Sequence, residues 1–248
     1  MASRYYYEGS LQPGNIELTD SEAHHLIHVK RARVGECIEV FDGQGNAVEA
    51  EVIELKKKLA VLKIDQQFRH DEEQSRLEIV LASAIPKSDR FRWLIEKATE
   101  IGVTQFIPLI TQRSVVSPRN SKLEKHRQYV IEACKQSGRN HLMQISASMT
   151  LNELCTESEK TTQIFVGHPG TTFASLEQFQ QCLKTTTTSL LLVVGPEGGL
   201  TNQELNLLDD KNVIRVCCSP HILRIETAGL VMSTVAVCAV NSNAETKK

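Results

Sequence analysis

Hydrophobic and polar residues alternate along much of the first 70 positions, as in short strands with one buried face. Three stretches follow this alternation: residues 36–41, 46–55 and 58–64. The sequence DGQG at residues 42–45 predicts a tight turn after the first of them. Residues 21–29 predict one helix, with Thr19 or Asp20 as its N-cap. Together these elements favour a small β-barrel.

From residue 77 onward, apolar runs without alternation take turns with amphipathic segments. The predicted strands are residues 77–84, 105–110, 164–166, 190–194 and 213–216. The predicted helices are residues 88–101, 123–137, 202–210 and 226–240. Strands that read as buried on both faces, alternating with helices, are typical of a mostly parallel α/β sheet. We expect Trp93, the single tryptophan, to pack the first of these helices onto the sheet.

A polar stretch at residues 71–76 separates the two patterns. It predicts two domains, residues 1–72 and residues 73–248. The threonine run at residues 185–188 is of low complexity and is expected to be a loop.

The 248 residues include 41% hydrophobic and 23% charged residues, which is ordinary globular usage and excludes disordered and coiled-coil classes. A net charge of −2 argues against a protein that is basic throughout, although residues 71–140 carry 12 Lys and Arg against 9 Asp and Glu. Seven cysteines without metal-type spacing suit a reducing compartment. The N-terminus lacks a signal-peptide pattern and no apolar run is long enough for a membrane span, so we expect a cytoplasmic protein without membrane contact.

The sequence VVGPEGGL at residues 193–200 follows a predicted buried strand and precedes a helix. Its three glycines let the backbone turn sharply and approach a ligand. This position, at the carboxyl end of a parallel strand, is where open α/β sheets bind ligands. The sequence lacks the lysine of a phosphate-binding P-loop, which disfavours a nucleotide-binding enzyme. A tight turn with Thr201 as N-cap is the alternative reading.

Two further segments carry candidate chemistry. The sequence CCSPHILRIET at residues 217–227 places Arg224 and Glu226 before an apolar helix, although an Arg–Glu pair at a helix start explains it equally. The sequence EACKQSGR at residues 132–139 ends a predicted helix and is expected to present polar side chains at a rim. A phosphate-binding surface would use Lys87, Arg90, Arg92, Gln136, Ser137 and Arg139, unless these are simply solvated.

Basic residues also gather at the end of the first predicted helix. These are His24, His25, His28, Lys30, Arg31 and Arg33. His24 and His28 share a helical face, but no further ligand completes a metal shell, so we expect an RNA-contacting edge and no metal. The chain has no GxSxG sequence, which leaves a serine hydrolase without support.

In combination, these segments resemble a known family. The sequences YYYEG, AHHLIHVKRARVGECIEVFDGQG, AIPKSDRFRWLIEKATEIGV, RSVV, EACKQSGR, VVGPEGGLTNQEL and HILRIETAG occur in order from about residue 4 to residue 238. They resemble SPOUT-class methyltransferases that modify N3 of uridine in 16S ribosomal RNA. The resemblance implies an N-terminal PUA-like RNA-binding barrel and a C-terminal α/β domain with a trefoil knot, which periodicity could not have suggested.

The resemblance also implies a homodimer that binds S-adenosyl-L-methionine in the knot and acts on uridine 1498 of the small (30S) ribosomal subunit. It assigns cofactor contacts to His168, Gly195, Pro196, Glu197, Gly198, Gly199, Cys218, His221, Ile222, Leu223 and Arg224. The chemistry of methyl transfer to N3 adds three catalytic candidates: Arg139 or Arg224 to stabilise the charge that develops on the uracil oxygens, and Glu226 as the base that accepts the N3 proton, unless it only caps the helix. The RNA contacts are His25, Lys30, Arg31, Arg33, Lys87, Arg90, Gln136 and Arg139.

The chain departs from the family pattern before ILR. The family usually has Leu-Gly-Pro-Arg there, whereas this chain has Cys218, Ser219, Pro220 and His221, and Ile225 replaces a threonine. Loss of the glycine is expected to restrict the backbone, and loss of the arginine removes a cation. These departures leave a catalytically silent RNA-binding protein as one alternative. A 2′-O-ribose methyltransferase, with the same fold and cofactor but a different acceptor, is another.

Overall fold

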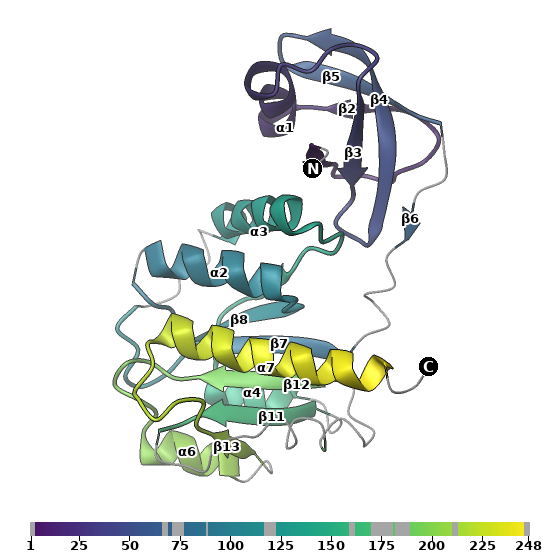
Figure 1. The fold of residues 1–248 in the computed structure, drawn as a ribbon. Coiled ribbons are helices and arrows are strands. Elements are labelled where there is room, and N and C mark those ends of the chain that lie inside the picture. The colour runs from purple at the N-terminus through teal and green to yellow at the C-terminus, as the bar shows by residue number, and fades with distance from the viewer. Residues whose placement is uncertain are drawn as a thin grey trace. The chain divides into compact units, whose positions relative to one another are not determined.

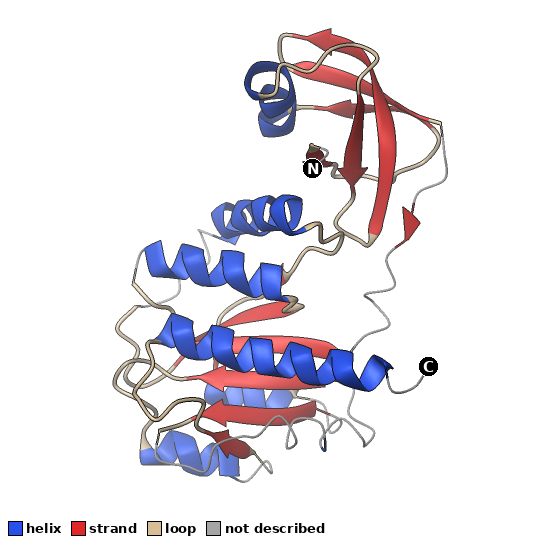
Figure 2. Cartoon of the chain, in the orientation of Figure 1, coloured by secondary structure: helices blue, strands red, loops and turns tan. Residues whose placement is uncertain are grey.

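The structure is a computed structural model, and it describes residues 3–65, 69–70, 77–87, 89–116, 123–158, 162–169, 181, 189–209 and 213–245. The chain forms two compact units, shown in Figure 1 and, by secondary structure, in Figure 2. One comprises Met1–Ser75 with Cys134–Leu142, and the other Arg76–Ala133 with Met143–Lys248. The predicted boundary near residue 72 and the threonine run at residues 185–188 lie outside the described residues.

The N-terminal unit is built on a six-stranded sheet with the order β1-β3-β4-β5-β2, and β6 pairs with β4. Its strands are β1 Arg4–Tyr6, β2 Gly14–Leu18, β3 Cys37–Phe41, β4 Asn46–Lys56, β5 Leu59–Ile64 and β6 Arg69–His70. The predicted strands correspond to β3, β4 and β5, whereas β1 and β2 were missed. The predicted helix begins as α1 (Asp20–His24) and continues as one π-helical turn, η1 (His25–Val29).

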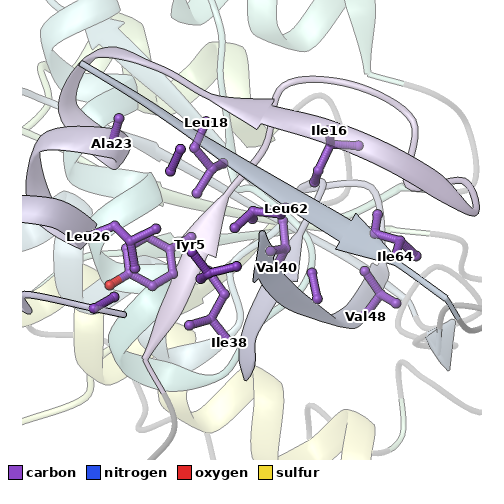
Figure 3. Close-up of a cluster of buried hydrophobic side chains, with 14 of the residues drawn as sticks. Tyr5, Ile16, Leu18, Ala23, Leu26, Ile38, Val40, Val48, Leu62 and Ile64 are labelled. Atoms are coloured by element: carbon purple, nitrogen blue, oxygen red, sulfur yellow. The ribbon is translucent and has the colours of Figure 1, made fainter. Parts of the chain in front are cut away.

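Inward-facing positions of these strands and of the helix form the core of the N-terminal unit (Figure 3). Tyr5 of β1, Val40 of β3 and Leu62 of β5 are fully buried. Alternate residues of β4, such as Val48, Ala50 and Val52, also point into this core, as the period of two requires. The alternation of hydrophobic and polar residues in this part of the sequence therefore corresponds to a sheet with one buried face.

The segment Cys134–Leu142 belongs to the N-terminal unit by its contacts, although the predicted second domain includes it. Nη1 of Arg4 donates to the carbonyl oxygen of Cys134 at 3.0 Å, and the amide of Leu142 donates to the carbonyl oxygen of Gly43 at 3.0 Å. Lys135 forms an ion pair with Glu22 at 3.1 Å, with both side chains largely buried. A hydrophobic pattern does not reveal such a crossing.

The C-terminal unit contains a seven-stranded sheet in which every described pairing is parallel. The order is β10-β8-β7-β12-β11-β13, with β9 on β8. The strands are β7 Glu78–Ser83, β8 Gln105–Ile110, β9 Gln144–Ile145, β10 Met149–Thr150, β11 Thr162–Gly167, β12 Ser189–Val194 and β13 Ile214–Val216. The helices are α2 Asp89–Ile101, α3 Leu123–Ser137, α4 Leu151–Glu157, α6 Asn202–Asp209 and α7 Ile225–Glu245. The parallel α/β prediction is confirmed, and β9, β10 and α4 are additions to it.

Helices cover both faces of this sheet, and all six residues of β12 are buried. Leucines of α4 and α6 pack on one face, while α2 and α7 lie together on the other (Figure 1). The prediction for Trp93 is wrong, because its side chain is 45% exposed. Phe91, Leu94, Ile95 and Ala98 occupy the buried stripe of α2, and position 93 falls outside it.

Candidate active site

A cavity of about 450 Å³ opens at the carboxyl edge of the C-terminal sheet. Its walls come from the segments that follow β11, β12 and β13, from the start of α7, and from one residue of the segment after β8. The lining residues are Arg113, Gly167–Pro169, Val194–Leu200, Val216–Ser219, His221–Ile225, Ala228 and Met232. Ligands of open parallel sheets bind at this edge.

The glycine-rich loop after β12 is a turn in which the amide of Gly199 donates to the carbonyl oxygen of Pro196 at 2.8 Å. Gly199 has a φ of +69°, a left-handed conformation that glycine adopts without strain. Gly198 serves a different purpose, since a Cβ there would lie 3.3 Å from Cδ of Arg113. The glycines therefore set both the shape of this loop and its close packing.

The second loop, after β13, carries the departures from the family pattern. Among the described non-glycine residues only Asp20 and Arg31 have positive φ, so Ser219 has an ordinary backbone conformation. The hydroxyl of Ser219 accepts a hydrogen bond from the amide of His221 at 3.0 Å. Serine therefore fits this position without backbone strain, and its hydroxyl closes the turn. Ile222 is 87% exposed on this loop.

The third loop begins where β11 ends. The amide of His168 donates to the carbonyl oxygen of Val216 at 2.8 Å, which ties this loop to the end of β13. Below it, a Cβ on Gly167 would lie 3.0 Å from Sδ of Met232, so the floor of the cavity is tightly packed. Burial raises the pKa of the Cys218 thiol above its ordinary value, and the adjacent Cys217 adds to this. Cys218 therefore stays a neutral thiol in the wall.

All eleven residues that the resemblance assigns to the cofactor line this one cavity. They come from three separate segments, and their roles remain predictions. Arg224, one of the three catalytic candidates, lines it too.

The other two catalytic candidates do not line the cavity. Glu226 is 5% exposed, and its Oε1 pairs with Nη1 of Arg90 at 3.4 Å. Its Oε2 is buried without a hydrogen-bond partner among the described residues. Nη2 of Arg90 also lies 4.0 Å from Oε1 of Glu197, so Arg90 connects the glycine-rich loop to the start of α7. Glu226 thus pairs with a guanidinium and does not line the cavity.

The RNA-binding candidates are distributed over both units. Lys30, Arg31 and Arg33 are exposed in the N-terminal unit after η1, where His25 is half-buried. Lys87 and Gln136 are exposed as well. The expectation that Arg139 lies at a rim needs correction, because its side chain folds inward and the residue is only 9% exposed.

Sequence reasoning missed Arg113 as a lining residue. Its Nη1 donates to the carbonyl oxygen of Gly198 at 2.7 Å. Arg113 begins the RSVV sequence, three residues after the carboxyl end of β8. That position, at the same sheet edge as the glycine-rich loop, was the available signal.

Within the described part of the chain, no group of three or more His, Cys, Asp or Glu side chains is arranged to hold a metal ion. No described helix is both long and apolar enough to span a membrane. The cavity combines apolar walls, exposed backbone groups and two guanidinium groups, from Arg113 and Arg224. Such a lining is typical of a binding site for a small organic molecule.

The comparisons with known proteins agree with this architecture. A family model described as RNA methyltransferase domain matches residues 73–237, and one described as RNA methyltransferase PUA domain matches residues 18–65. The chain therefore belongs to the RNA methyltransferase family that these models define.

Within this family, the relatives are ribosomal RNA small subunit methyltransferases E. The protein of Bacillus subtilis is 29% identical over 239 residues, which cover 92% of this chain and 93% of the relative. That of Synechocystis is 30% identical over 230 residues, covering 92% of this chain and 73% of the relative. A crystal structure of ribosomal RNA small subunit methyltransferase E from Neisseria gonorrhoeae, bound to S-adenosyl methionine, has a TM-score of 0.82 at 28% identity and covers 98% of both chains.

Proposed function

We propose that this chain is an S-adenosyl-L-methionine-dependent methyltransferase that methylates N3 of uridine 1498 in 16S ribosomal RNA. The convergence of eleven predicted cofactor residues on one cavity carries this proposal. The similarity to ribosomal RNA small subunit methyltransferases E supports the substrate. We further propose that it works as a homodimer in the cytoplasm, with the trefoil knot that the resemblance implies.

The cavity residues fit the cofactor on physical grounds. Gly195 and Gly198 allow Leu200 and Arg113 to pack against the glycine-rich loop, since a Cβ at these positions would lie 3.0 Å and 3.3 Å from their side chains, and this packing shapes the wall of the cavity. Ile222 and Leu223 supply apolar surface for the adenine. When bound, S-adenosyl-L-methionine supplies an electrophilic methyl group on a sulfonium.

The residues of this chain then have to bind and orient uracil. As N3 loses its proton, negative charge develops on the two uracil oxygens, and a guanidinium placed beside them lowers the barrier. Arg224 lines the cavity and is our candidate within the chain. Arg139 lies outside the lining, so its proposed catalytic role requires the active site to be shared with a second subunit. We propose that Glu226 acts through Arg90, a predicted RNA contact, rather than as the proton acceptor.

The proposal predicts that S-adenosylhomocysteine binds the chain and that labelled methyl groups pass from S-adenosyl-L-methionine to unmodified small ribosomal subunits. Arg224→Met should abolish transfer and also weaken S-adenosylhomocysteine binding, because this side chain is assigned both to the cofactor and to uracil. Arg215→Met is the matched control, since Arg215 pairs with Asp209 and does not line the cavity. Absence of binding to the unaltered chain would refute the proposal.

A further inference from the structure

Glu204, near the start of α6, is a carboxylate that is only 6% exposed. Its Oε2 accepts hydrogen bonds from the amide and the hydroxyl of Thr201, at 2.8 and 2.9 Å. Its own amide donates to the hydroxyl of Thr201 at 3.3 Å. This reciprocal pattern is a capping box, which satisfies free amides at the start of a helix.

The other carboxylate oxygen of Glu204 forms a hydrogen bond outside α6. Oε1 accepts a hydrogen bond at 2.8 Å from the backbone amide of Gln112, in the segment that follows β8. A second tie lies one residue further along, where the guanidinium of Arg113 donates to the carbonyl oxygen of Gly198. The stem of Arg113 also packs against Gly198. We refer to Glu204, Gln112, Arg113 and Gly198 as the brace.

The brace joins the segment after β8 to the glycine-rich loop at Gly198, 85 positions away from Arg113, and to the start of α6 at Glu204, 92 positions away from Gln112. The segment after β8 is itself held tight, because the amide of Thr111 donates to the hydroxyl of Ser114 at 3.1 Å. The loop is therefore anchored to a fixed part of the sheet edge, and not only to its own strand and helix.

Helix α4 shows what a capping box does without a brace. The amide and hydroxyl of Thr150 donate to Oε2 of Glu153 at 2.7 and 2.9 Å, and the amide of Glu153 donates back at 3.3 Å. These contacts match those of Thr201 and Glu204, yet Glu153 is exposed. Capping thus does not require a buried carboxylate. Burying one is costly unless hydrogen bonds compensate, and the additional bond from Gln112 does so.

We propose that Glu204 is a positioning residue that holds the glycine-rich loop in the shape that binds the cofactor. It acts through the amide of Gln112 and through the placement of Arg113 against Gly198. The inference rests on the proposed function, since it assumes that this loop binds S-adenosyl-L-methionine.

The test compares Glu204→Gln with Glu153→Gln, which weakens the equivalent cap of α4 away from the cavity. Calorimetric titration with S-adenosylhomocysteine should show a dissociation constant raised about 10-fold for Glu204→Gln, since one hydrogen bond to a charged group is lost. Glu153→Gln should bind like the unaltered chain. In transfer assays, Glu204→Gln should raise KM for S-adenosyl-L-methionine and leave KM for the ribosomal subunit unchanged. Equal binding by both variants would overturn the inference.

A second variant separates positioning from a loss of folding. Arg113→Met removes the other tie at an exposed side chain, without touching α6. If both ties hold the same loop, the double variant with Glu204→Gln should lose less affinity than the sum of the two single losses. Strictly additive losses would contradict a shared brace. Failure of the unaltered chain to bind S-adenosylhomocysteine would instead refute the proposed function, and this inference with it.

Discussion

The conformation of Gly199 gives a quantitative test of the glycine-rich loop. Its φ of +69° lies in the left-handed region, and its amide closes the turn onto Pro196. A Cβ added at this position would have no heavy atom within 4 Å, so Gly199→Ala introduces backbone strain without a steric clash. For an L-residue other than glycine that strain is about 1–2 kcal/mol.

This strain has two ways to appear. If the loop keeps its shape, the free energy of unfolding falls; if the loop relaxes, the affinity for S-adenosylhomocysteine falls instead. The two losses together should amount to about 1–2 kcal/mol, which is about 5- to 30-fold in the dissociation constant if all of it appears in binding. Gly199→Asn should recover part of the loss, because asparagine tolerates the left-handed region.

Calorimetric titration measures the affinity for S-adenosylhomocysteine, and chemical unfolding of the same samples measures the free energy of unfolding. Gly35→Ala is the matched control, since Gly35 has a φ of +90°, equally open surroundings and a place in the N-terminal unit. It should lower stability and leave the affinity unchanged. If Gly199→Ala changes neither quantity, the reasoning about this turn is refuted.

Three further predictions concern other parts of the chain. Arg139→Ala should abolish methyl transfer and leave S-adenosylhomocysteine binding nearly intact; retained transfer at the unaltered rate would remove Arg139 from catalysis. Arg90→Met should lower the free energy of unfolding by about 1–3 kcal/mol, because it leaves the buried carboxylate of Glu226 without its cation, and adding Glu226→Gln should restore part of it. Burial raises the pKa of Tyr5 from 10.0 to about 12, so the folded state holds this proton more tightly than the unfolded state. The contribution of Tyr5 to the free energy of unfolding is therefore fully present below pH 10 and falls by up to about 3 kcal/mol as the pH rises toward 12. In unfolding experiments, Tyr5→Phe should show less of this fall.

The sequence predicted the elements whose pattern has a clear period. Strand β8 and helix α3 have the predicted bounds, and β12 and α2 differ by one residue at a terminus. Strands β1 and β2, of three and five residues, were missed. Trp93 was misplaced because a large apolar residue was assumed to be buried, whereas the register of α2 decides which positions face the sheet.

The loops of the candidate site could be predicted because their glycine, proline and apolar residues form recognisable local sequence patterns. The two loops around Gly195 and Leu223 line one cavity as expected. The roles of Arg113 and Glu204 depend on contacts between distant segments, which no local pattern contains. The pairing of Glu226 with Arg90 likewise joins residues 136 positions apart. This pairing is the basis for the orienting role that we propose for Glu226.

The most direct test of the account identifies the nucleoside that receives the methyl group. Unmodified small ribosomal subunits would be incubated with the chain and labelled S-adenosyl-L-methionine, and the 16S RNA then digested and separated by nucleoside. The proposed function predicts label in 3-methyluridine, mapped to position 1498. Label in a 2′-O-methylated nucleoside, or no transfer despite binding of S-adenosylhomocysteine, would contradict it.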